Sequence, residues 1–200
     1  MKILNLYAGI GGNRKLWGDE HEVTAIELEP EIAAIYQDFF PKDKVIVTDA
    51  HQYLLEHFKE FDFIWSSPPC PTHSKFMISK KTFPNWKMPY PDMSLYQEII
   101  FLQSWFKGKF VVENVMSYYK PLIRPYELQR HYFWSNFPIP KEYFPADHIR
   151  DTTVKELEKH HGINLDGYKI DKSKVLSNCV NPKVALFIFN MAFKEKQSTL

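Results

Sequence analysis

The sequence predicts an α/β fold: a doubly wound, mostly parallel sheet with a small C-terminal appendage. Over the first 115 residues, short apolar runs typical of strands alternate with stretches whose apolar residues recur every three or four positions, as in helices. Such alternation implies βαβ units with right-handed crossovers. The 200 residues are 44% hydrophobic and 16% aromatic, enough to bury a core, so we expect one domain, with or without a small addition.

The elements of this core follow one another in a regular order. Strands are expected at residues 3–7, 23–27, 44–47, 61–65 and 110–113, and helices at residues 29–39 and 94–106. After residue 120 prolines become frequent and the regular winding ends.

Three further segments are expected beyond that point. Residues 128–135 suit a strand or hairpin. Residues 149–174 carry many charges and few large apolar groups, which suits a surface helix and loop. Residues 177–193 return to helical apolar spacing and are expected to pack on the sheet.

Composition excludes several classes of protein. The formal net charge is +1, so any affinity for nucleic acid would come from local patches. Cys70 and Cys179 are too few for a disulfide framework or a four-cysteine zinc site, and Cys179 is expected to be an inert buried thiol. His73, His160 and His161 lack further ligands at suitable spacing, so no metal is assigned. No export signal or apolar run of ~20 residues is present, and we expect a cytoplasmic protein.

A glycine-rich turn follows the first predicted strand. Residues 7–12 read Tyr-Ala-Gly-Ile-Gly-Gly and open a segment expected to be helical, and glycines let the backbone approach a ligand closely. Glu27, at the end of the second strand, can accept hydrogen bonds from two ribose hydroxyls, and Asp49 is placed to bind an adenine amino group. These features indicate an adenosine-containing cofactor, and the spacing of the glycines disfavours a nicotinamide dinucleotide. A tight connection and two helix caps remain the structural alternative.

Two reactive side chains are expected at the same edge of the sheet. Cys70 follows the fourth strand in a loop stiffened by prolines, and ligands of open α/β sheets bind beyond the carboxyl ends of the strands. The thiol therefore suits a nucleophile facing the cofactor. Glu113 ends the fifth strand, where partial burial would raise its pKa and let it hold a proton for a ring nitrogen or amino group. A helix cap shared with Asn114 is the alternative role for Glu113.

Several short motifs occur in a set order along the chain: Asp49 and residues 6–12, 27–29, 69–70, 113–115, 129–130 and 177–180. In this order they resemble the motifs of DNA (cytosine-5) methyltransferases, whose fold is the Rossmann-like fold of S-adenosylmethionine-dependent methyltransferases. The combination of Pro69-Cys70 with Glu113-Asn-Val115 is the most specific part of the match.

The resemblance implies roles for the matching residues. Cys70 would be the nucleophile, Glu113 would recognise the target base, and S-adenosylmethionine would be converted to S-adenosylhomocysteine. In this chemistry a thiolate adds to carbon 6 of cytosine, and Arg130 is our candidate for the cation that lowers the pKa of the thiol. The cofactor-binding positions are Tyr7, Ala8, Gly9, Gly11, Gly12, Glu27, Leu28, Asp49, Ala50, Pro69, Leu95, Asn178 and Val180.

The segment between Cys70 and Leu95 suits contact with nucleic acid, because lysines alternate with aromatic residues. The target base lies inside a stacked duplex, so the enzyme would flip it out or act on single strands. A solvated loop is the alternative reading. The lysines expected to contact nucleic acid are Lys75, Lys80, Lys81 and Lys87.

The chain departs from the family pattern in composition and in length. Ser67, Pro71, Leu128 and Ser177 replace a glycine, a glutamine, an arginine and a glycine of the family. Only 46 residues separate Arg130 from Ser177, where family members insert a target-recognition domain. We therefore expect a minimal enzyme with relaxed sequence preference, or one that takes its specificity from a partner chain. The expected division is a catalytic core at 1–127, a reduced target-recognition region at 128–176 and a C-terminal segment at 177–200.

The favoured substrate is double-stranded DNA, and the favoured state is a monomer in the cytoplasm of a bacterium or of a virus-infected host. Single-stranded DNA and RNA stay open as substrates. The alternative enzyme is an amino-group (N4/N6) methyltransferase, because residues 67–70 resemble a Ser-Pro-Pro-aromatic motif with cysteine at its last position. The alternative from another class is a non-catalytic module that binds nucleic acid.

Overall fold

A seven-stranded sheet forms the centre of the molecule, with the strand order β3-β2-β1-β4-β5-β7-β6. The structure, a computed structural model, describes residues 1–79, 85–145 and 152–194. Neighbouring strands from β3 to β5 are parallel, whereas β7 is antiparallel to both β5 and β6. The strands are β1 (Lys2–Leu6), β2 (Glu22–Glu27), β3 (Lys44–Val47), β4 (Phe63–Ser66), β5 (Lys109–Val115), β6 (Tyr126–Leu128) and β7 (His131–Ser135). The predicted doubly wound, mostly parallel sheet is therefore confirmed.

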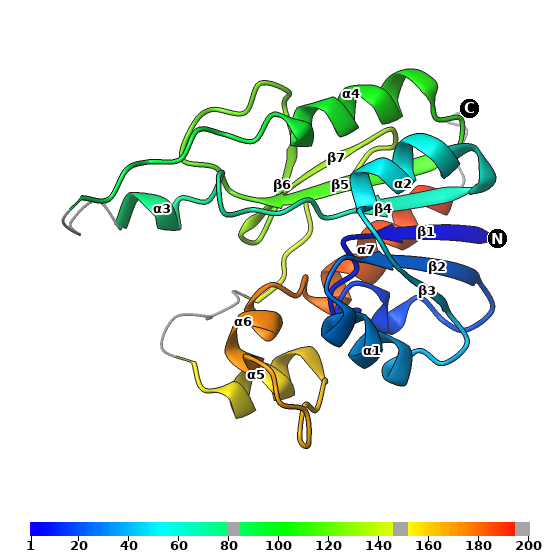
Figure 1. Cartoon of the computed structure of the whole chain (residues 1–200). Helices are drawn as coiled ribbons and strands as arrows, with labels where there is room; N and C mark the ends of the chain where they lie inside the picture. The colour runs from blue at the N-terminus through cyan, green and yellow to red at the C-terminus, as the bar shows by residue number, and fades with distance from the viewer. Residues whose placement is uncertain (80–84, 146–151, 195–200) are drawn as a thin grey trace.

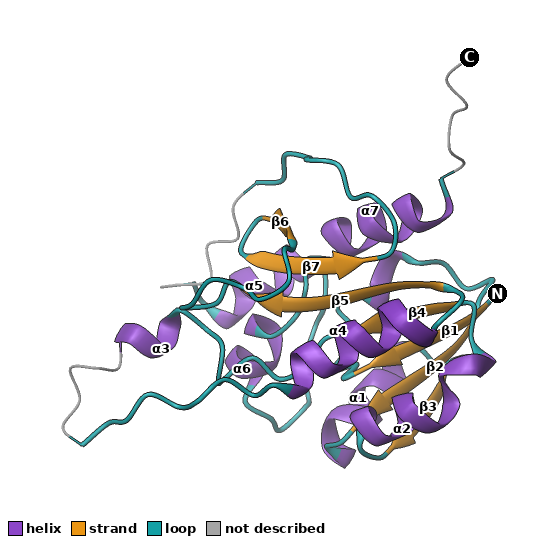
Figure 2. Ribbon diagram, turned by 90° about the horizontal axis from the view of Figure 1, so that it is seen from above, coloured by secondary structure: helices purple, strands orange, loops and turns teal. Residues whose placement is uncertain are grey.

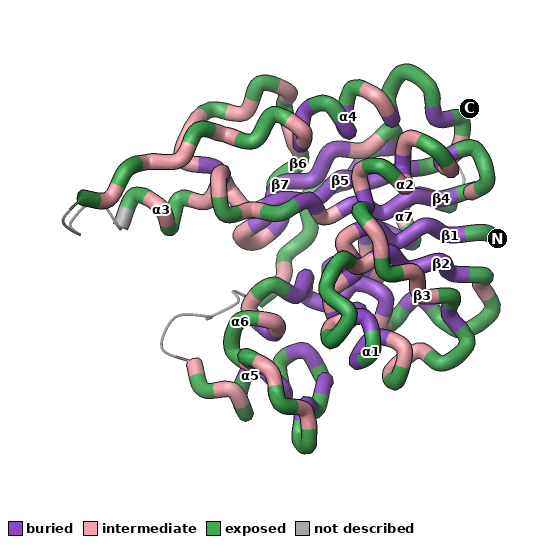
Figure 3. The backbone as a smooth tube through the Cα atoms, viewed as in Figure 1, coloured by how far each residue is buried: buried purple, intermediate pink, exposed green. Residues whose placement is uncertain are grey.

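Helices cover both faces of this sheet (Figure 1). The α-helices are α1 (Pro30–Phe39), α2 (Ala50–His57), α3 (Phe76–Ser79), α4 (Ser94–Trp105), α5 (Val154–His161), α6 (Lys172–Ser177) and α7 (Pro182–Phe193). Two short 3-10 helices, η1 (Arg14–Leu16) and η2 (Phe58–Glu60), complete the described elements. The tube in Figure 3 shows the buried strands between helices that are exposed on their outer sides.

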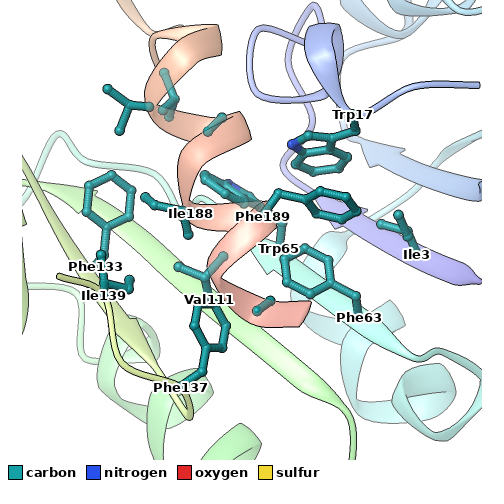
Figure 4. Packing of buried hydrophobic residues seen from close by; sticks show 14 of the residues in the cluster. Ile3, Trp17, Phe63, Trp65, Val111, Phe133, Phe137, Ile139, Ile188 and Phe189 are labelled. Atoms are coloured by element: carbon teal, nitrogen blue, oxygen red, sulfur yellow. The ribbon is translucent and has the colours of Figure 1, made fainter. Parts of the chain in front are cut away.

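Successive side chains of a strand point to opposite faces of the sheet, so each face of the sheet packs on its own set of helices. One face packs on α2 and α4, through residues that include Leu4, Ile64 and Val112. The other face packs on α7, as predicted for residues 177–193. In Figure 4, Ile188 and Phe189 of α7 lie against a cluster that includes Trp17, Phe63, Trp65 and Val111.

The strand order reverses beside β1, whose neighbours are β2 on one side and β4 on the other. In open α/β sheets, ligands bind at such a reversal, beyond the carboxyl ends of the strands. Leu6 of β1 is in register with both Ile26 of β2 and Ser66 of β4. The segments that follow β1, β2 and β4 therefore start side by side at one edge.

Two predicted segments are present but differ in length or burial from what was expected. The helix expected after the glycine turn is the short 3-10 helix η1, and the chain turns at Gly18, which adopts φ +86°. The helix and loop expected within residues 149–174 are present in the described part as α5 and the segment that follows it. They are not confined to the surface, because Leu157, Ile163 and Leu165 are buried in a cluster with Ile10 of the glycine turn.

The hairpin β6–β7 extends the sheet at its edge beyond β5 (Figure 2). Gln129 adopts a left-handed φ of +52° between the two strands. Because His131 pairs with Val115, this turn lies at the carboxyl end of β5. The expected boundary between residues 127 and 128 falls inside β6, so the hairpin belongs structurally to the sheet of the core.

Candidate active site

The turn after β1 has the geometry of a backbone cradle. Tyr7 and Gly9 have left-handed φ values of +55° and +54°, and the turn is closed by a hydrogen bond from Gly11 N to Ala8 O of 3.0 Å. A Cβ atom built on Gly9 would meet no atom within 4 Å, so the space beside this residue is open. A ligand can therefore approach the backbone closely at Gly9.

Gly11 and Gly12 serve packing within the protein. A Cβ atom on Gly11 would lie 2.2 Å from the ring of Phe40, and one on Gly12 would lie 2.7 Å from Cβ of Cys179. Cys179 is buried, its pKa is raised by burial to about 12, and its thiol donates to the carbonyl of Val175, as expected for an inert thiol. The C-terminal motif thus lies directly on the first turn, with Val180 buried.

Glu27 and Asp49 stand at the ends of neighbouring strands, and each binds backbone donors. Glu27 accepts hydrogen bonds from Gly9 N (2.9 Å) and Glu29 N (3.0 Å). A carboxylate has about four acceptor positions, so Glu27 retains capacity for two ribose hydroxyls. Asp49 caps α2 by accepting from Gln52 N at 2.7 Å, which is the structural alternative to adenine binding.

The other residues predicted to bind the cofactor differ in how far they are buried. Ala50 starts α2 and is buried, and Leu95 is buried in the first turn of α4. Leu28 is exposed. Pro69 and Asn178 are also exposed, in the loop after β4 and directly after α6.

The loop that follows β4 and carries Cys70 is held by a hydrogen bond from strand β5 and by hydrogen bonds within the loop itself. Asn114 on β5 donates its amide Nδ2 to the carbonyl of Pro68 at 2.9 Å. The carbonyl of Cys70 accepts from the backbone N–H groups of His73 (3.0 Å) and Ser74 (3.1 Å), which turns the chain back. Cys70 is half-buried as a residue, so it is not part of the sealed core. These contacts fix the position of the loop that carries it.

Glu113 is buried at the end of β5, and burial raises its pKa from 4.5 to about 7. A hydrogen bond from the Ser67 side chain and the positive charge of Arg130 oppose this rise. The prediction that burial raises the pKa of Glu113 agrees with this environment. His131 Nε2 lies 3.6 Å from Glu113 Oε1, and burial lowers the pKa of His131 well below its ordinary value, so this histidine is neutral.

Arg130 lies at the tip of the β6–β7 hairpin and donates from Nη2 to the carbonyl of Ser177 at 2.9 Å. The positive charge of Arg130 lowers the pKa of Cys70, as predicted, but two larger effects raise it. Burial and the charge of Glu113 raise the pKa of Cys70 above its ordinary value. Desolvation of the half-buried Cys70 is the largest of these effects, and it sets the net direction.

Two of the four lysines predicted to contact nucleic acid, Lys75 and Lys87, lie on a projecting arm (Figure 1). Lys75 is exposed and directly precedes α3, which extends away from the sheet (Figures 1 and 2). Lys87 and Tyr90 are exposed on the returning part of the arm. Lys80 and Lys81 lie outside the described residues.

Sequence reasoning missed three side chains of this site. The sequence suggests only a helix cap for Asn114, although its place beside Glu113 in the Glu-Asn-Val motif is a usable signal. Ser67 departs from the family pattern, and its contact with Glu113 is not evident from the sequence. The proximity of His131 to Glu113 depends on the antiparallel pairing of β7 with β5, which no local pattern shows.

The strand order, the antiparallel β7 and the open turn after β1 define the chain as having the fold of S-adenosylmethionine-dependent methyltransferases. The family model for C-5 cytosine-specific DNA methylases matches residues 1–120. The chain belongs to this family, and its cofactor is S-adenosylmethionine. The open space at Gly9 and the spare acceptor capacity of Glu27 fit such a ligand.

Solved structures agree with this fold. A mutant of Spodoptera frugiperda DNMT2 is similar with a TM-score of 0.62 and 15% sequence identity, over 96% of this chain and 99% of that one. The Entamoeba histolytica methyltransferase EhMeth is similar with a TM-score of 0.60 and 12% identity, over 98% of this chain and 99% of that one. A search of the curated proteins found no match. Within the described ranges, no helix has the length and apolar character needed to span a membrane.

Proposed function

We propose that this chain transfers a methyl group from S-adenosylmethionine to carbon 5 of cytosine in DNA, through a transient bond between Cys70 Sγ and carbon 6 of the base. The observation that carries the proposal is the convergence of three side chains at one sheet edge: the thiol after β4, the carboxyl of Glu113 on β5, and the guanidinium of Arg130. Glu113 and Arg130 both act electrostatically on the pKa of Cys70, in opposite directions.

The chemistry requires a nucleophile because carbon 5 of cytosine reacts poorly with electrophiles by itself. Addition of the Cys70 thiolate to carbon 6 breaks the double bond between carbons 5 and 6 and makes its electron pair available at carbon 5. S-adenosylmethionine, when bound, supplies a methyl group on a positively charged sulfur and is converted to S-adenosylhomocysteine. A base then takes the proton from carbon 5, and the electron pair of that bond restores the double bond between carbons 5 and 6 and expels the sulfur of Cys70 as thiolate.

Glu113 is suited to assist at the opposite side of the base. With a pKa of about 7, it is about equally protonated and ionised at neutral pH. The protonated carboxyl would donate a hydrogen bond to N3 of cytosine and stabilise the charge that develops on the ring. Protonation also removes the negative charge that raises the pKa of Cys70, so the same proton favours the thiolate.

Access to the reacting carbon would require the cytosine to leave the duplex. We assign the first contact with DNA to the arm that carries Lys75 and Lys87, since exposed lysines attract phosphates and Tyr90, which is 93% exposed, can stack on a base. Residues 128–176 would form a reduced substrate-contact region on the core of residues 1–127. Because this region is so small, we expect the enzyme either to have a relaxed sequence preference or to take its specificity from a partner chain.

Covalent trapping tests the proposal directly. A duplex oligonucleotide carrying 5-fluorocytosine, incubated with S-adenosylmethionine, is expected to form an adduct with the protein, because fluorine cannot leave carbon 5 as a proton does. Intact-mass measurement should find one oligonucleotide per chain, and peptide mapping should find it on Cys70. The chain offers a matched control in its second cysteine: Cys179→Ala should retain the adduct, and Cys70→Ala should lose it.

Other outcomes would point to other functions. Methylated product without an adduct, with the methyl group on an exocyclic amine, would favour an amino-group methyltransferase and overturn the proposal. Adduct formation with RNA and none with DNA would retain the mechanism and change the substrate. Absence of methyl transfer to any nucleic acid, with binding retained, would indicate a binding module.

A further inference from the structure

A buried carboxylate that the proposed chemistry does not use lies beneath the site. Glu98 projects from α4 and is completely buried. Its Oε1 accepts a hydrogen bond from the hydroxyl of Tyr7 at 2.6 Å and lies 2.9 Å from His51 Nδ1. Its Oε2 accepts from the hydroxyl of Ser66 at 2.7 Å. One carboxylate thus joins four elements of the fold.

The three partners of Glu98 stand where the chain enters the proposed site. Tyr7 opens the glycine turn with its left-handed φ of +55°. Ser66 is the last residue of β4, directly before the loop that carries Cys70. His51 lies in the first turn of α2, which Asp49 caps. The cofactor side and the thiol side of the site therefore share a single acceptor.

Simple packing does not call for a carboxylate at this position. The neighbouring buried residues of α4 are Leu95, Ile99 and Leu102, so an apolar side chain would suit the same face. A buried carboxylate is costly unless hydrogen bonds and a counter-charge compensate it. Here two hydroxyls compensate it, and the hydrogen bond with Glu98 raises the pKa of His51. The charged groups that also act on His51 are Asp49 and Asp92.

We propose that Glu98 is a positioning residue that sets the glycine turn and the Cys70 loop in register with each other. Through Tyr7 it holds the turn that receives the cofactor, and through Ser66 it holds the strand end that delivers the thiol. The inference rests on the proposed roles of these two segments in methyl transfer. It predicts that the two hydrogen bonds have separable effects.

Single substitutions at the two hydroxyls make that separation measurable. Tyr7→Phe should weaken the binding of S-adenosylhomocysteine, measured by calorimetry, by about ten- to a hundredfold, as expected for loss of a hydrogen bond to a charged group. Ser66→Ala should leave that affinity unchanged. It should alter the rate at which iodoacetamide alkylates Cys70, measured in a Cys179→Ala background so that Cys70 is the one thiol.

Glu98→Gln should produce one of the two effects, because the amide oxygen can replace one acceptor and the amide nitrogen cannot accept from the other hydroxyl. Glu98→Asp, which keeps the carboxylate, should recover part of that loss. Gln97→Ala, at the exposed neighbouring position on α4, is the matched control and should change neither. If Glu98→Gln does not fold, the Tyr7→Phe and Ser66→Ala pair still decides the question.

The proposal is overturned if Tyr7→Phe and Ser66→Ala change the two readouts together, or if neither changes. Ligand affinity and thiol alkylation need no nucleic acid. A chain that failed to trap 5-fluorocytosine could therefore still show the separated effects, and the two proposals fail independently.

Discussion

Replacing Glu113 by glutamine should stabilise the protein at alkaline pH while removing its methyl-transfer activity. Glutamine keeps the shape of the side chain and cannot ionise, so it avoids burying a negative charge at the end of β5. The wild-type protein accepts that charge whenever the pH exceeds the pKa of about 7. The substitution therefore measures how much stability the protein gives up to hold a titrating carboxyl at this site.

The magnitude follows from the two pKa values. In the unfolded chain Glu113 has an ordinary pKa of 4.5, and in the folded protein burial raises it to about 7. The folded state therefore binds more protons between these values, so the free energy of unfolding decreases as the pH rises through that window. Each pKa unit corresponds to about 1.4 kcal/mol, and the full penalty, reached above about pH 7, is about 3 kcal/mol.

Urea unfolding of both proteins at pH 5 and at pH 8 is the appropriate assay. The free energy of unfolding of Glu113→Gln, relative to wild type, should be greater at pH 8 than at pH 5 by about 2–3 kcal/mol. Glu127→Gln, at an exposed position of β6, is the control and should show no such difference. An equal advantage or disadvantage of Glu113→Gln at both pH values would refute the reasoning.

Three other substitutions test contacts around the site. Gly12→Ala should lower the free energy of unfolding by about 1–3 kcal/mol in thermal or urea melts, because its Cβ would lie 2.7 Å from Cβ and 2.9 Å from Sγ of Cys179. Adding Cys179→Ala, which removes the sulfur and keeps the Cβ, should restore part of the loss. Asn114→Ala should lower it by about 1–3 kcal/mol, because it leaves a buried carbonyl without its donor, and should reduce kcat more than cofactor affinity. Arg130→Gln should raise the pKa of Cys70 further, so alkylation of that thiol at pH 8 should slow, and an unchanged rate would contradict the assignment of Arg130 as its cation.

Much of the core could be predicted because the buried parallel strands are short apolar runs. The strand at 44–47 has the expected bounds, and the helix α4 begins at the expected residue 94. Strand β5 was predicted to end at Glu113 and extends two residues further, to Val115. Helix α2 escaped detection because it buries only Ala50 and Leu54, too few to show a helical period. The end of β4 at Ser66 was missed because its buried hydroxyl has its partner on α4.

The remaining errors have one physical origin, which is contact between segments far apart in the sequence. Leu157, Ile163 and Leu165 come from a helix and a loop, so their burial against Ile10 leaves no regular spacing to recognise. Glu98 has a core-facing position, three residues after Leu95 and four before Leu102, but a charged side chain does not predict burial, and only its distant partners make that burial favourable. The candidate site itself was predictable because its motifs follow strand ends, where the topology brings them together.

The contact between Gly12 and Cys179 also bears on the order in which the molecule is assembled. The first turn of the chain is completed by a residue that leaves the ribosome more than 160 positions later. A nascent chain can pair its early strands, yet it lacks one wall of the cofactor turn until the C-terminal segment arrives. Competence to bind the methyl donor would thus be acquired near the end of synthesis, and a chain cut short before this segment would lack the support of that wall.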